Sequence, residues 1–301
     1  MLTFLRSVFI VARNELKDAV RSRRVAILLI LYLAGAMLAS NGIISMLHRV
    51  EIELTKALAV TPSATTGVVT DILWKSDAFR NTIIHLVGDK KTAMELLSIP
   101  PVALIYAWLA FTFTPFFIII SSSGRIAEEV RHGSVRFVLT RTSRYAWCLG
   151  KFMGQAMEIV IPLILSAIGV WCIARFRLTH INNAALISAT MIYAWKVWVY
   201  LLAFIGLALG ISQITRSVNI AISISFIIWI AMVILHAFAK RYAGPGIQQL
   251  WQLVEMITPT GHKLNLWRTD MAHVLQACTY LVTLAFTYLF FGFIVFNKRD
   301  L

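Results

Sequence analysis

The stretch Gly124–Lys151, GRIAEEVRHGSVRFVLTRTSRYAWCLGK, lies between two long apolar runs and decides how the rest of the chain is arranged. It carries six cations and only two carboxylates, and short segments rich in Lys and Arg resist translocation, which places such a loop on the cytoplasmic side of a membrane. Its apolar residues recur at near-helical spacing, interrupted by Gly133. This pattern predicts a short amphipathic helix along the inner face of the membrane, with a polar side offered to a soluble partner.

The composition excludes an ordinary soluble domain. Apolar residues make up 59% of the 301-residue chain and charged residues 14%, whereas about a quarter of a typical soluble domain is charged. The net charge of +14 is scattered among apolar runs, which favours basic loops facing anionic lipid over binding of nucleic acid. The three cysteines include no CxxC pair, so they suggest neither a disulfide framework nor a zinc site.

Six apolar runs are long enough to cross a bilayer, which takes about 20 helical residues. The predicted spans cover about residues 25–47, 102–122, 152–174, 197–214, 218–239 and 274–296. An interfacial piece is expected at 184–196, before the fourth span, and Pro115 is expected to kink the second. The fold class is therefore an all-α integral membrane protein, with one six-span domain over residues 25–301.

The segments between these spans divide into two sets. Residues 1–24 place Phe4, Val8, Val11, Leu16 and Val20 on one helical face, which predicts an amphipathic helix resting in the interface. The outer segments 48–101 and 240–273 are too polar to span and contain amphipathic helical pieces.

Lys and Arg are denser in residues 1–24, in the 124–151 loop and at the C-terminal end than in the outer segments. This density predicts a multi-pass protein of the inner (plasma) membrane with both termini cytoplasmic.

The polar loop also contains a recognisable motif. Its parts are Glu128-Glu129, Gly133-Ser134-Val135, Val138-Leu139-Thr140, Ser143-Arg144 and Gly150-Lys151-Phe152. They resemble the signature of ABC-2 permeases, the membrane subunits of one class of ABC exporter. The six spans, the long first outer segment and the inner turn at Arg216-Ser217 are similar to that family as well. The family's proline before Ser-Arg is absent, and Thr142 stands near its place.

The resemblance implies a mechanism in which this chain has no chemistry of its own. Two permeases, as a homodimer or with a related permease, would each bind a cytoplasmic ABC ATPase, which supplies the ATP and magnesium sites. The loop would be the coupling helix that docks on this ATPase, and the N-terminal helix would form part of the same cradle. The residues that the resemblance assigns to ATPase coupling are Glu128, Glu129, Arg131, Gly133, Ser134, Arg136 and Arg144.

The chain's own motifs agree with the absence of a nucleotide site. Gly150-Lys151 is not a Walker loop, because Tyr145 stands where the first glycine is required and Phe152 replaces Ser or Thr. No HExxH or other metal-ligand spacing occurs. We therefore expect no cofactor in this chain, with ATP hydrolysis supplied by a separate polypeptide.

Two charges within the spans need an explanation, because a charge at membrane depth costs about 2.5–3.5 kcal/mol on insertion scales. Glu158 would lie about 9 Å into the third span, at 1.5 Å per residue. It could line an inner vestibule on the transport pathway, or pair with Lys151 near the interface. Lys196, between Trp195 and Trp198, is expected to snorkel in an aromatic belt and not to pair with Glu158.

Two other functional classes remain open. An ion-coupled carrier or a membrane-integral enzyme would need several convergent polar groups at midplane depth, and Glu158 looks alone. A non-transporting membrane anchor of a larger complex is the second. The substrate is not indicated by the sequence, and the 48–101 segment could meet a periplasmic or extracellular partner or shield an exit.

Overall fold

The computed structural model of the chain describes residues 2–57, 76–77, 80–81, 83–84, 90–178, 182–242 and 248–298. Within these residues the regular elements are helices, with no strand. They are α1 (Leu2–Arg21), α2 (Arg23–Ala57), α5 (Lys90–Leu97), α6 (Pro101–Ser122), α7 (Arg125–His132), α8 (Ser134–Leu139), α9 (Arg144–Arg177), α10 (Asn183–Ile214), α11 (Val218–Tyr242), α12 (Gln248–Ile257), the 3₁₀ helix η1 (Pro259–His262), α13 (Lys263–Trp267) and α14 (Met271–Asn297).

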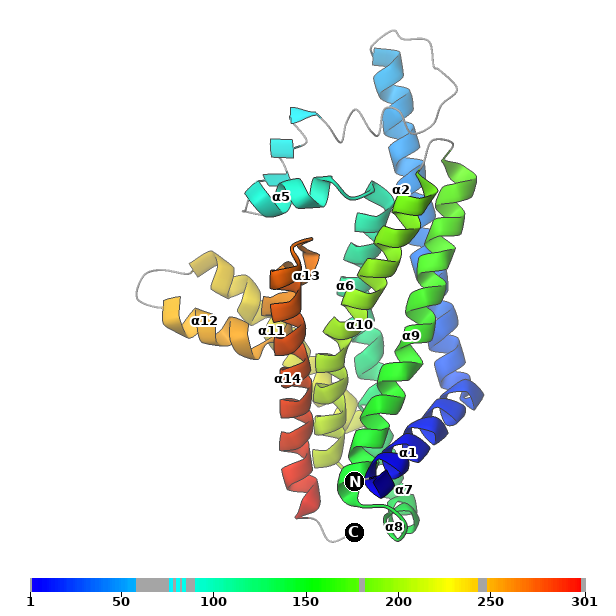
Figure 1. Cartoon of the computed structure of the whole chain (residues 1–301), viewed down its shortest axis with the longest axis vertical. Coiled ribbons are helices and arrows are strands. Elements are labelled where there is room, and N and C mark those ends of the chain that lie inside the picture. Colours follow the sequence, from blue (N-terminus) through cyan, green and yellow to red (C-terminus); the bar gives the residue numbers. More distant parts are fainter. Residues whose placement is uncertain are drawn as a thin grey trace.

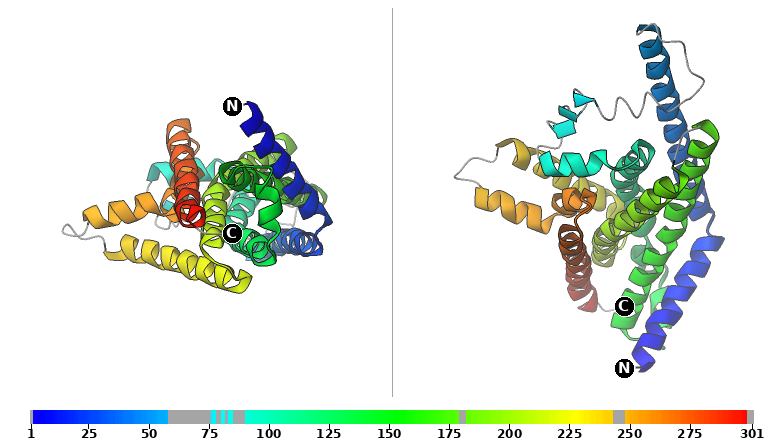
Figure 2. Two further views of the ribbon diagram at one scale, coloured as in Figure 1. Left: turned by 90° about the horizontal axis from the view of Figure 1, so that it is seen from below. Right: turned by 45° about the horizontal axis from the view of Figure 1, so that its top comes forward.

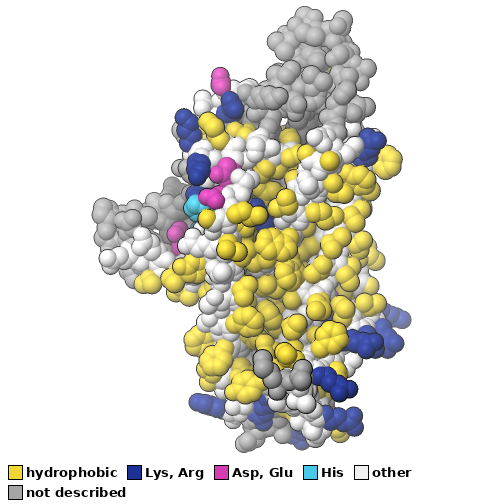
Figure 3. Space-filling view, viewed as in Figure 1, with side chains coloured by type: hydrophobic (Ala, Val, Ile, Leu, Met, Phe, Trp, Pro, Cys, Tyr) yellow, Lys and Arg dark blue, Asp and Glu magenta, His cyan; other side chains and the backbone are white. Residues whose placement is uncertain are grey.

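Six of these helices, α2, α6, α9, α10, α11 and α14, are long and apolar enough to cross a membrane, which confirms the all-α membrane fold and makes this a multi-pass membrane protein. They form an elongated bundle, and a band of apolar side chains covers its middle (Figures 1 and 3). The start of α1, the helices α7 and α8 and the end of α14 lie together at the lower end of the bundle in Figure 1. We call this the loop end, and the end that carries α5 and α13 the far end.

The helix α10 is the centre of the bundle, and most of its side chains are buried. It packs along α14 through three glycines. A Cβ atom at Gly206 would overlap the carbonyl oxygen of Ala285, and one at Gly210 would overlap that of Tyr288. On the facing helix, a Cβ atom at Gly292 would overlap Gly210. Small residues spaced by four allow membrane helices to approach this closely, where van der Waals contact replaces the hydrophobic effect as the driving force.

A second glycine pair attaches α1 to the bundle. Gly150 of α9 has Val11 against its Cα, and Gly154 has Glu15 and the carbonyl of Ala12. The helix α1 therefore packs on α9 and does not only rest in the interface.

The side of α1 that docks on α9 is a narrow buried stripe. It runs through Val8, Val11, Ala12, Glu15 and Ala19. Val8 and Val11 also belong to the predicted apolar face, whereas Phe4 and Val20 of that face are exposed at the surface of the chain.

Several predicted boundaries differ from the structure, because continuous helices pass through positions where the hydropathy changes. The helix α2 runs on to Ala57, ten residues beyond the predicted end of the first span, and α9 begins at Arg144, eight residues before its predicted start. The helix α10 is a single element, so the separate interfacial piece at 184–196 was wrong. The helix α6 continues through Pro115. Parts of the two predicted outer segments, including 58–75 and 243–247, lie outside the described residues.

Candidate functional site

The Gly124–Lys151 loop folds as two short helices and the start of α9, where one short helix was predicted. Gly133 separates α7 from α8 with a φ of 71°, a left-handed conformation that ends helices and that glycine adopts without steric cost. The hydroxyl of Ser134 donates to the carbonyl oxygen of Glu129 at 3.2 Å and ties the start of α8 back to α7. The pair of helices is therefore a bent unit with a defined corner.

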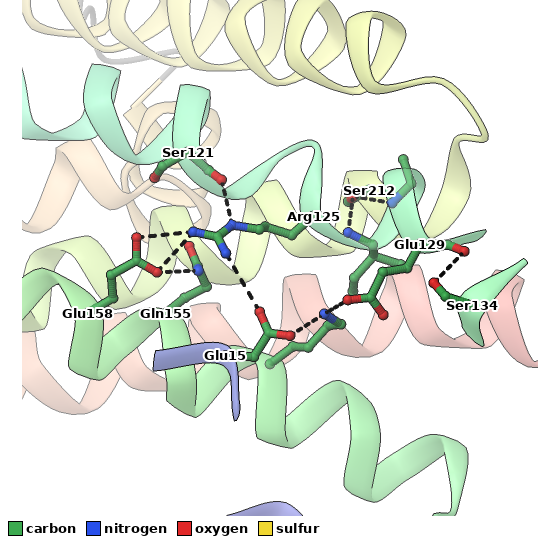
Figure 4. A network of polar contacts seen from close by, with 11 residues as sticks. Glu15, Ser121, Arg125, Glu129, Ser134, Gln155, Glu158 and Ser212 are labelled. Carbon is green, nitrogen blue, oxygen red and sulfur yellow. Dashed lines mark hydrogen bonds and ion pairs between the residues drawn. The ribbon is translucent and has the colours of Figure 1, made fainter. Parts of the chain in front are cut away.

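The start of α7 is fixed to the centre of the bundle. Ile126 and Ala127 are fully buried, and their backbone N–H groups donate to the hydroxyl oxygen of Ser212 on α10, at 3.1 and 2.9 Å (Figure 4). The first N–H groups of a helix have no partner within the helix, so a buried helix start needs such an acceptor. Ser212 therefore links α7 to the end of α10.

A buried ion pair joins three helices at the loop end. Lys151 of α9 is 1% exposed, and its Nζ atom donates to Glu15 Oε1 of α1 and to Glu129 Oε1 of α7, each at 2.5 Å. The same ammonium lies 5.3 Å from the centroid of the Trp147 ring, a favourable place for a cation. Lys151 thus holds the loop helix and the N-terminal helix to the third span at one point.

A second cation extends this network (Figure 4). Arg125 Nη2 contacts both carboxylate oxygens of Glu158 at 3.1 Å, its Nη1 lies 3.9 Å from Glu15 Oε2, and its Nε donates to the Ser121 carbonyl oxygen at 3.2 Å. Gln155 donates to Glu158 at 2.8 Å and accepts from the hydroxyl of Ser122 at 2.7 Å. The network therefore also includes the end of α6.

These contacts correct two expectations about Glu158. It pairs with Arg125 and not with Lys151. It is also not alone, because Glu15 shares Arg125 with it. A carboxylate bound on both oxygens by a guanidinium and by an amide is oriented and satisfied. We call Glu15, Arg125, Glu129, Lys151 and Glu158 the ion network.

The physical consequence of the ion network is rigidity more than net stability. Removing charges from water costs several kcal/mol per ion, and mutual attraction offsets this cost only when every partner is in place. A fully satisfied buried network specifies one arrangement of the elements that supply it. Here those elements are α1, α7 and α9, so they are expected to move as one body.

Arg144 has a structural partner within the chain. Its Nη1 donates to the carbonyl oxygens of Asn297 at 2.8 Å and Phe296 at 3.4 Å, and its guanidinium lies 5.9 Å from the Phe296 ring centroid. The last carbonyls of a helix lack partners and carry partial negative charge, so a cation there caps the helix. Arg144 therefore joins the start of α9 to the end of α14.

The other side of α7 and α8 is exposed. Arg131, Arg136 and Arg141 lie at the surface, and Phe137 of α8 is 80% exposed among them. Glu128 is half-buried and has an interaction of its own. An apolar ring in a cationic surrounding is the composition of a protein contact, in which aromatic side chains and Arg are enriched.

Six of the seven residues predicted for coupling divide into two groups, and the seventh, Glu128, is half-buried. Glu129, Gly133, Ser134 and Arg144 hold the loop together and to its own bundle, whereas Arg131 and Arg136 point to solvent.

The sequence reasoning did not identify Glu15, Arg125 and Ser212 as partners of the loop, nor Phe137 as its exposed ring. For Glu15 a signal existed. It follows Val11 and Ala12 at helical spacing on an apolar face, and an acid on such a face indicates a buried cation.

The snorkelling expected of Lys196 is not observed. Lys196 is 5% exposed, its Nζ donates to the Arg268 carbonyl oxygen at 2.8 Å, and it lies 4.8 Å from the centroid of the Tyr193 ring. A snorkelling lysine would extend its ammonium to water, whereas here the end of α13 provides the acceptor. Lys196 does not pair with Glu158, as expected.

Comparison with known families agrees with this arrangement. A search of curated proteins gives no match to the chain. A family model described as ABC-2 family transporter protein matches residues 9–301, which is nearly the whole chain and includes both helices of the loop and every candidate span. The chain therefore belongs to the ABC-2 family of transporter proteins.

Proposed function

We propose that this chain is the permease subunit of an ABC exporter and couples ATP hydrolysis by a separate ATPase to movement of substrate across the membrane. One observation carries this proposal. The helix α7 is held on one side to α1 and α9 by the ion network, while Arg131, Arg136 and Phe137 are presented to solvent on the other side.

This arrangement suits a lever. A partner that binds α7 and α8 and shifts them would also move α9, because Lys151 of α9 is paired with Glu129 of α7. It would move α10 as well, because Ser212 of α10 accepts hydrogen bonds from the start of α7. The partner in this proposal is a cytoplasmic ABC ATPase that holds ATP and magnesium, and a second permease copy or a related permease completes the transporter. The chain itself contributes no catalytic step.

The distribution of charge supports the proposed orientation. At the loop end, the face drawn in Figure 3 carries Lys and Arg side chains, whereas charges of both signs appear at the far end. Cationic segments remain on the cytoplasmic side of inner membranes. The proposal therefore places both termini and the loop in the cytoplasm and the far end outside. The outer part of α2, which extends above the bundle in Figure 1, offers a surface for an extracytoplasmic partner.

Docking can be tested by co-expression of the tagged permease with the ATPase encoded beside it. We expect Arg136→Glu and Phe137→Ala each to weaken binding of the ATPase by about thirtyfold and so to lower its recovery, since truncation of a central contact costs about 2 kcal/mol. The matched control is Arg177→Glu, an exposed arginine at the other end of α9. Equal recovery with all three variants would refute docking at this surface.

Orientation has an independent test. A cysteine placed at Arg136 should react with a membrane-impermeant maleimide only in inverted vesicles, and one placed at Phe176, which is 89% exposed at the other end of α9, only in right-side-out vesicles. The opposite labelling pattern would contradict the proposed topology.

The alternatives make different predictions. An ion-coupled carrier needs a carboxylate that can release a proton on its own, whereas each carboxylate of the ion network has a cation within 4.0 Å. A carrier would transport substrate in liposomes without ATP. A non-transporting anchor would retain the ATPase and show no vanadate-sensitive transport, which separates it from the exporter.

A further inference from the structure

A large groove lies between α6, α10, α11 and the η1–α13 segment, toward the far end of the bundle. Its volume is about 1110 Å³, at the upper limit of usual small-molecule sites. The walls are mainly apolar and aromatic, with Phe111 and Phe116 from α6, Tyr200 from α10, Trp229 from α11 and Trp267 from α13. No acidic residue is among the side chains found to line it.

The groove opens sideways, along a part of the bundle that would face hydrocarbon. Trp108 and Phe113 of α6 and Ile234 of α11 line it and are each about half exposed. Few residues of the apolar part of α11 are buried against the other helices. The helices α11 and α12 diverge from the bundle in Figure 2. An apolar chain could therefore enter from the bilayer without passing through water.

One end of the groove is polar and cationic. Lys263, the first residue of α13, lines it and is half-buried, and it makes no ion pair or hydrogen bond within the part of the chain that the structure describes. Burial lowers the pKa of this lysine, and no carboxylate acts against this effect. Thr260 places a buried hydroxyl oxygen at the same end, and this oxygen has no hydrogen-bond partner among the residues that the structure describes. Buried polar groups nearly always have a hydrogen-bond partner, so we expect the Lys263 ammonium and the Thr260 hydroxyl to bind an acceptor on a ligand.

We propose that the groove holds an anionic membrane phospholipid, with its acyl chains along the aromatic walls and its phosphate bound by Lys263 and Thr260. The charge excludes a cationic occupant, and the lateral opening favours a lipid over a ligand from water. The apolar walls provide the transfer free energy for the chains, and the lysine selects the headgroup. This proposal is independent of the proposed function, because a lipid site needs neither an ATPase nor transport.

Native mass spectrometry of the purified full-length chain tests this directly. The protein is delipidated in detergent and titrated with phosphatidylglycerol or with phosphatidylcholine of identical acyl chains. We expect phosphatidylglycerol to bind about fivefold more tightly, the ratio that corresponds to about 1 kcal/mol for one lysine near anionic lipid. Lys263→Met should abolish this preference, so that the two lipids bind equally.

Two variants complete the experiment. Lys90→Met removes an exposed lysine from α5 and should keep the preference. Ile234→Trp fills the groove from its exposed wall and should reduce the binding of both lipids. Equal binding of the two lipids by the wild-type chain would overturn the proposal whether or not the variants fold, as would a preference that survives Lys263→Met. A dimer that excludes lipid from the groove would also overturn it, because a second copy would then be the occupant.

Discussion

The two ends of the bundle are held together by different kinds of contact. At the loop end, ion pairs between side chains join helices that are far apart in the sequence, with Glu15, Glu129 and Lys151 meeting at one point. At the far end, the contacts are made mostly with backbone groups. Lys196 donates to the Arg268 carbonyl oxygen at 2.8 Å. The hydroxyl of Tyr193 donates to the Trp267 carbonyl oxygen at 3.0 Å.

This difference indicates which end keeps its shape. The ion network is buried and mutually dependent, so removing one member leaves other charges without a partner. The far end uses single contacts, each of which can be lost alone, and net hydrogen bonds contribute about 1 kcal/mol each. We therefore expect the loop end to be one body and the far end to separate more readily, which the proposed role in export would require of an exit for substrate.

The largest expected effect comes from Lys151→Met, which removes the central cation. Glu129 would then lose the cation that it contacts, Glu15 would keep only Arg125 at 3.9 Å, and breaking a buried pair costs about 3–5 kcal/mol. The free energy of unfolding in detergent, measured by titration with SDS, should fall by this amount. Lys298→Met, at an exposed position after α14, is the control and should change it by less than about 0.5 kcal/mol. A similar loss of unfolding free energy in Lys151→Met and Lys298→Met would show that the ion network does not act as a unit.

A slightly smaller loss is expected when α1 is pushed away from α9. A valine at Gly154 would overlap Glu15 and the carbonyl of Ala12, and overpacking of this kind costs about 1–3 kcal/mol. Gly35→Val on α2 is the matched control, because a Cβ atom there has nothing within 4 Å. Limited proteolysis should release α1 from Gly154→Val and leave it protected in the control. Protection in both variants would argue against close packing of α1 on α9.

At the far end, Lys196→Met should have a more modest effect. It keeps the apolar stem and removes one charged donor from the Arg268 carbonyl oxygen, a change worth about 1–2 kcal/mol. Thermal unfolding followed by tryptophan fluorescence would measure it, with Lys90→Met as the exposed control. A loss as large as that of Lys151→Met would contradict the contrast between the two ends.

The smallest effect should depend on pH. Glu95 accepts hydrogen bonds from the Thr269 backbone N–H and hydroxyl, each at 2.9 Å, and the backbone bond is the main reason that its pKa lies below the usual 4.5. A carboxyl group with a lowered pKa in the folded state stabilises the protein above its unfolded pKa, and this contribution is lost as the pH falls through the folded value.

The measurement compares wild type with Glu95→Gln. Wild type should be slightly more stable at pH 7, by under about 1 kcal/mol because the group is largely hydrated, and the advantage should shrink below about pH 4.5. Asp77→Asn, which removes an exposed carboxylate, provides the control. An advantage that persists at pH 3 would show that the pKa of Glu95 is not linked to folding.

Much of the fold could be predicted because lipid-length apolar runs have few alternatives. A segment such as Val218–Phe238 can satisfy its backbone in hydrocarbon only as a helix. Helix ends were less predictable, since the continuation of α2 to Ala57 and the early start of α9 at Arg144 depend on packing and capping more than on hydropathy. Gly133 was noted as an interruption, but one short helix was predicted there, and the structure has two that meet at this left-handed glycine.

The sequence located the candidate site but did not show which of its residues pack within the chain and which are exposed. The motif identified the loop, and the structure separates Arg144, which caps α14, from Arg131 and Arg136, which remain exposed. The neighbours of an arginine in the sequence do not show whether it caps a distant helix or remains exposed.

By itself, the sequence determined that this protein is a helical membrane bundle with a cationic, amphipathic loop, because hydropathy and charge act locally and along one dimension. Only the tertiary structure decided that Lys151 joins Glu15 to Glu129, and that Lys263 lines a groove with no ion pair or hydrogen bond among the described residues. Such pairings depend on which helix faces meet across more than a hundred residues of chain, and glycines such as Gly154 set how closely they meet.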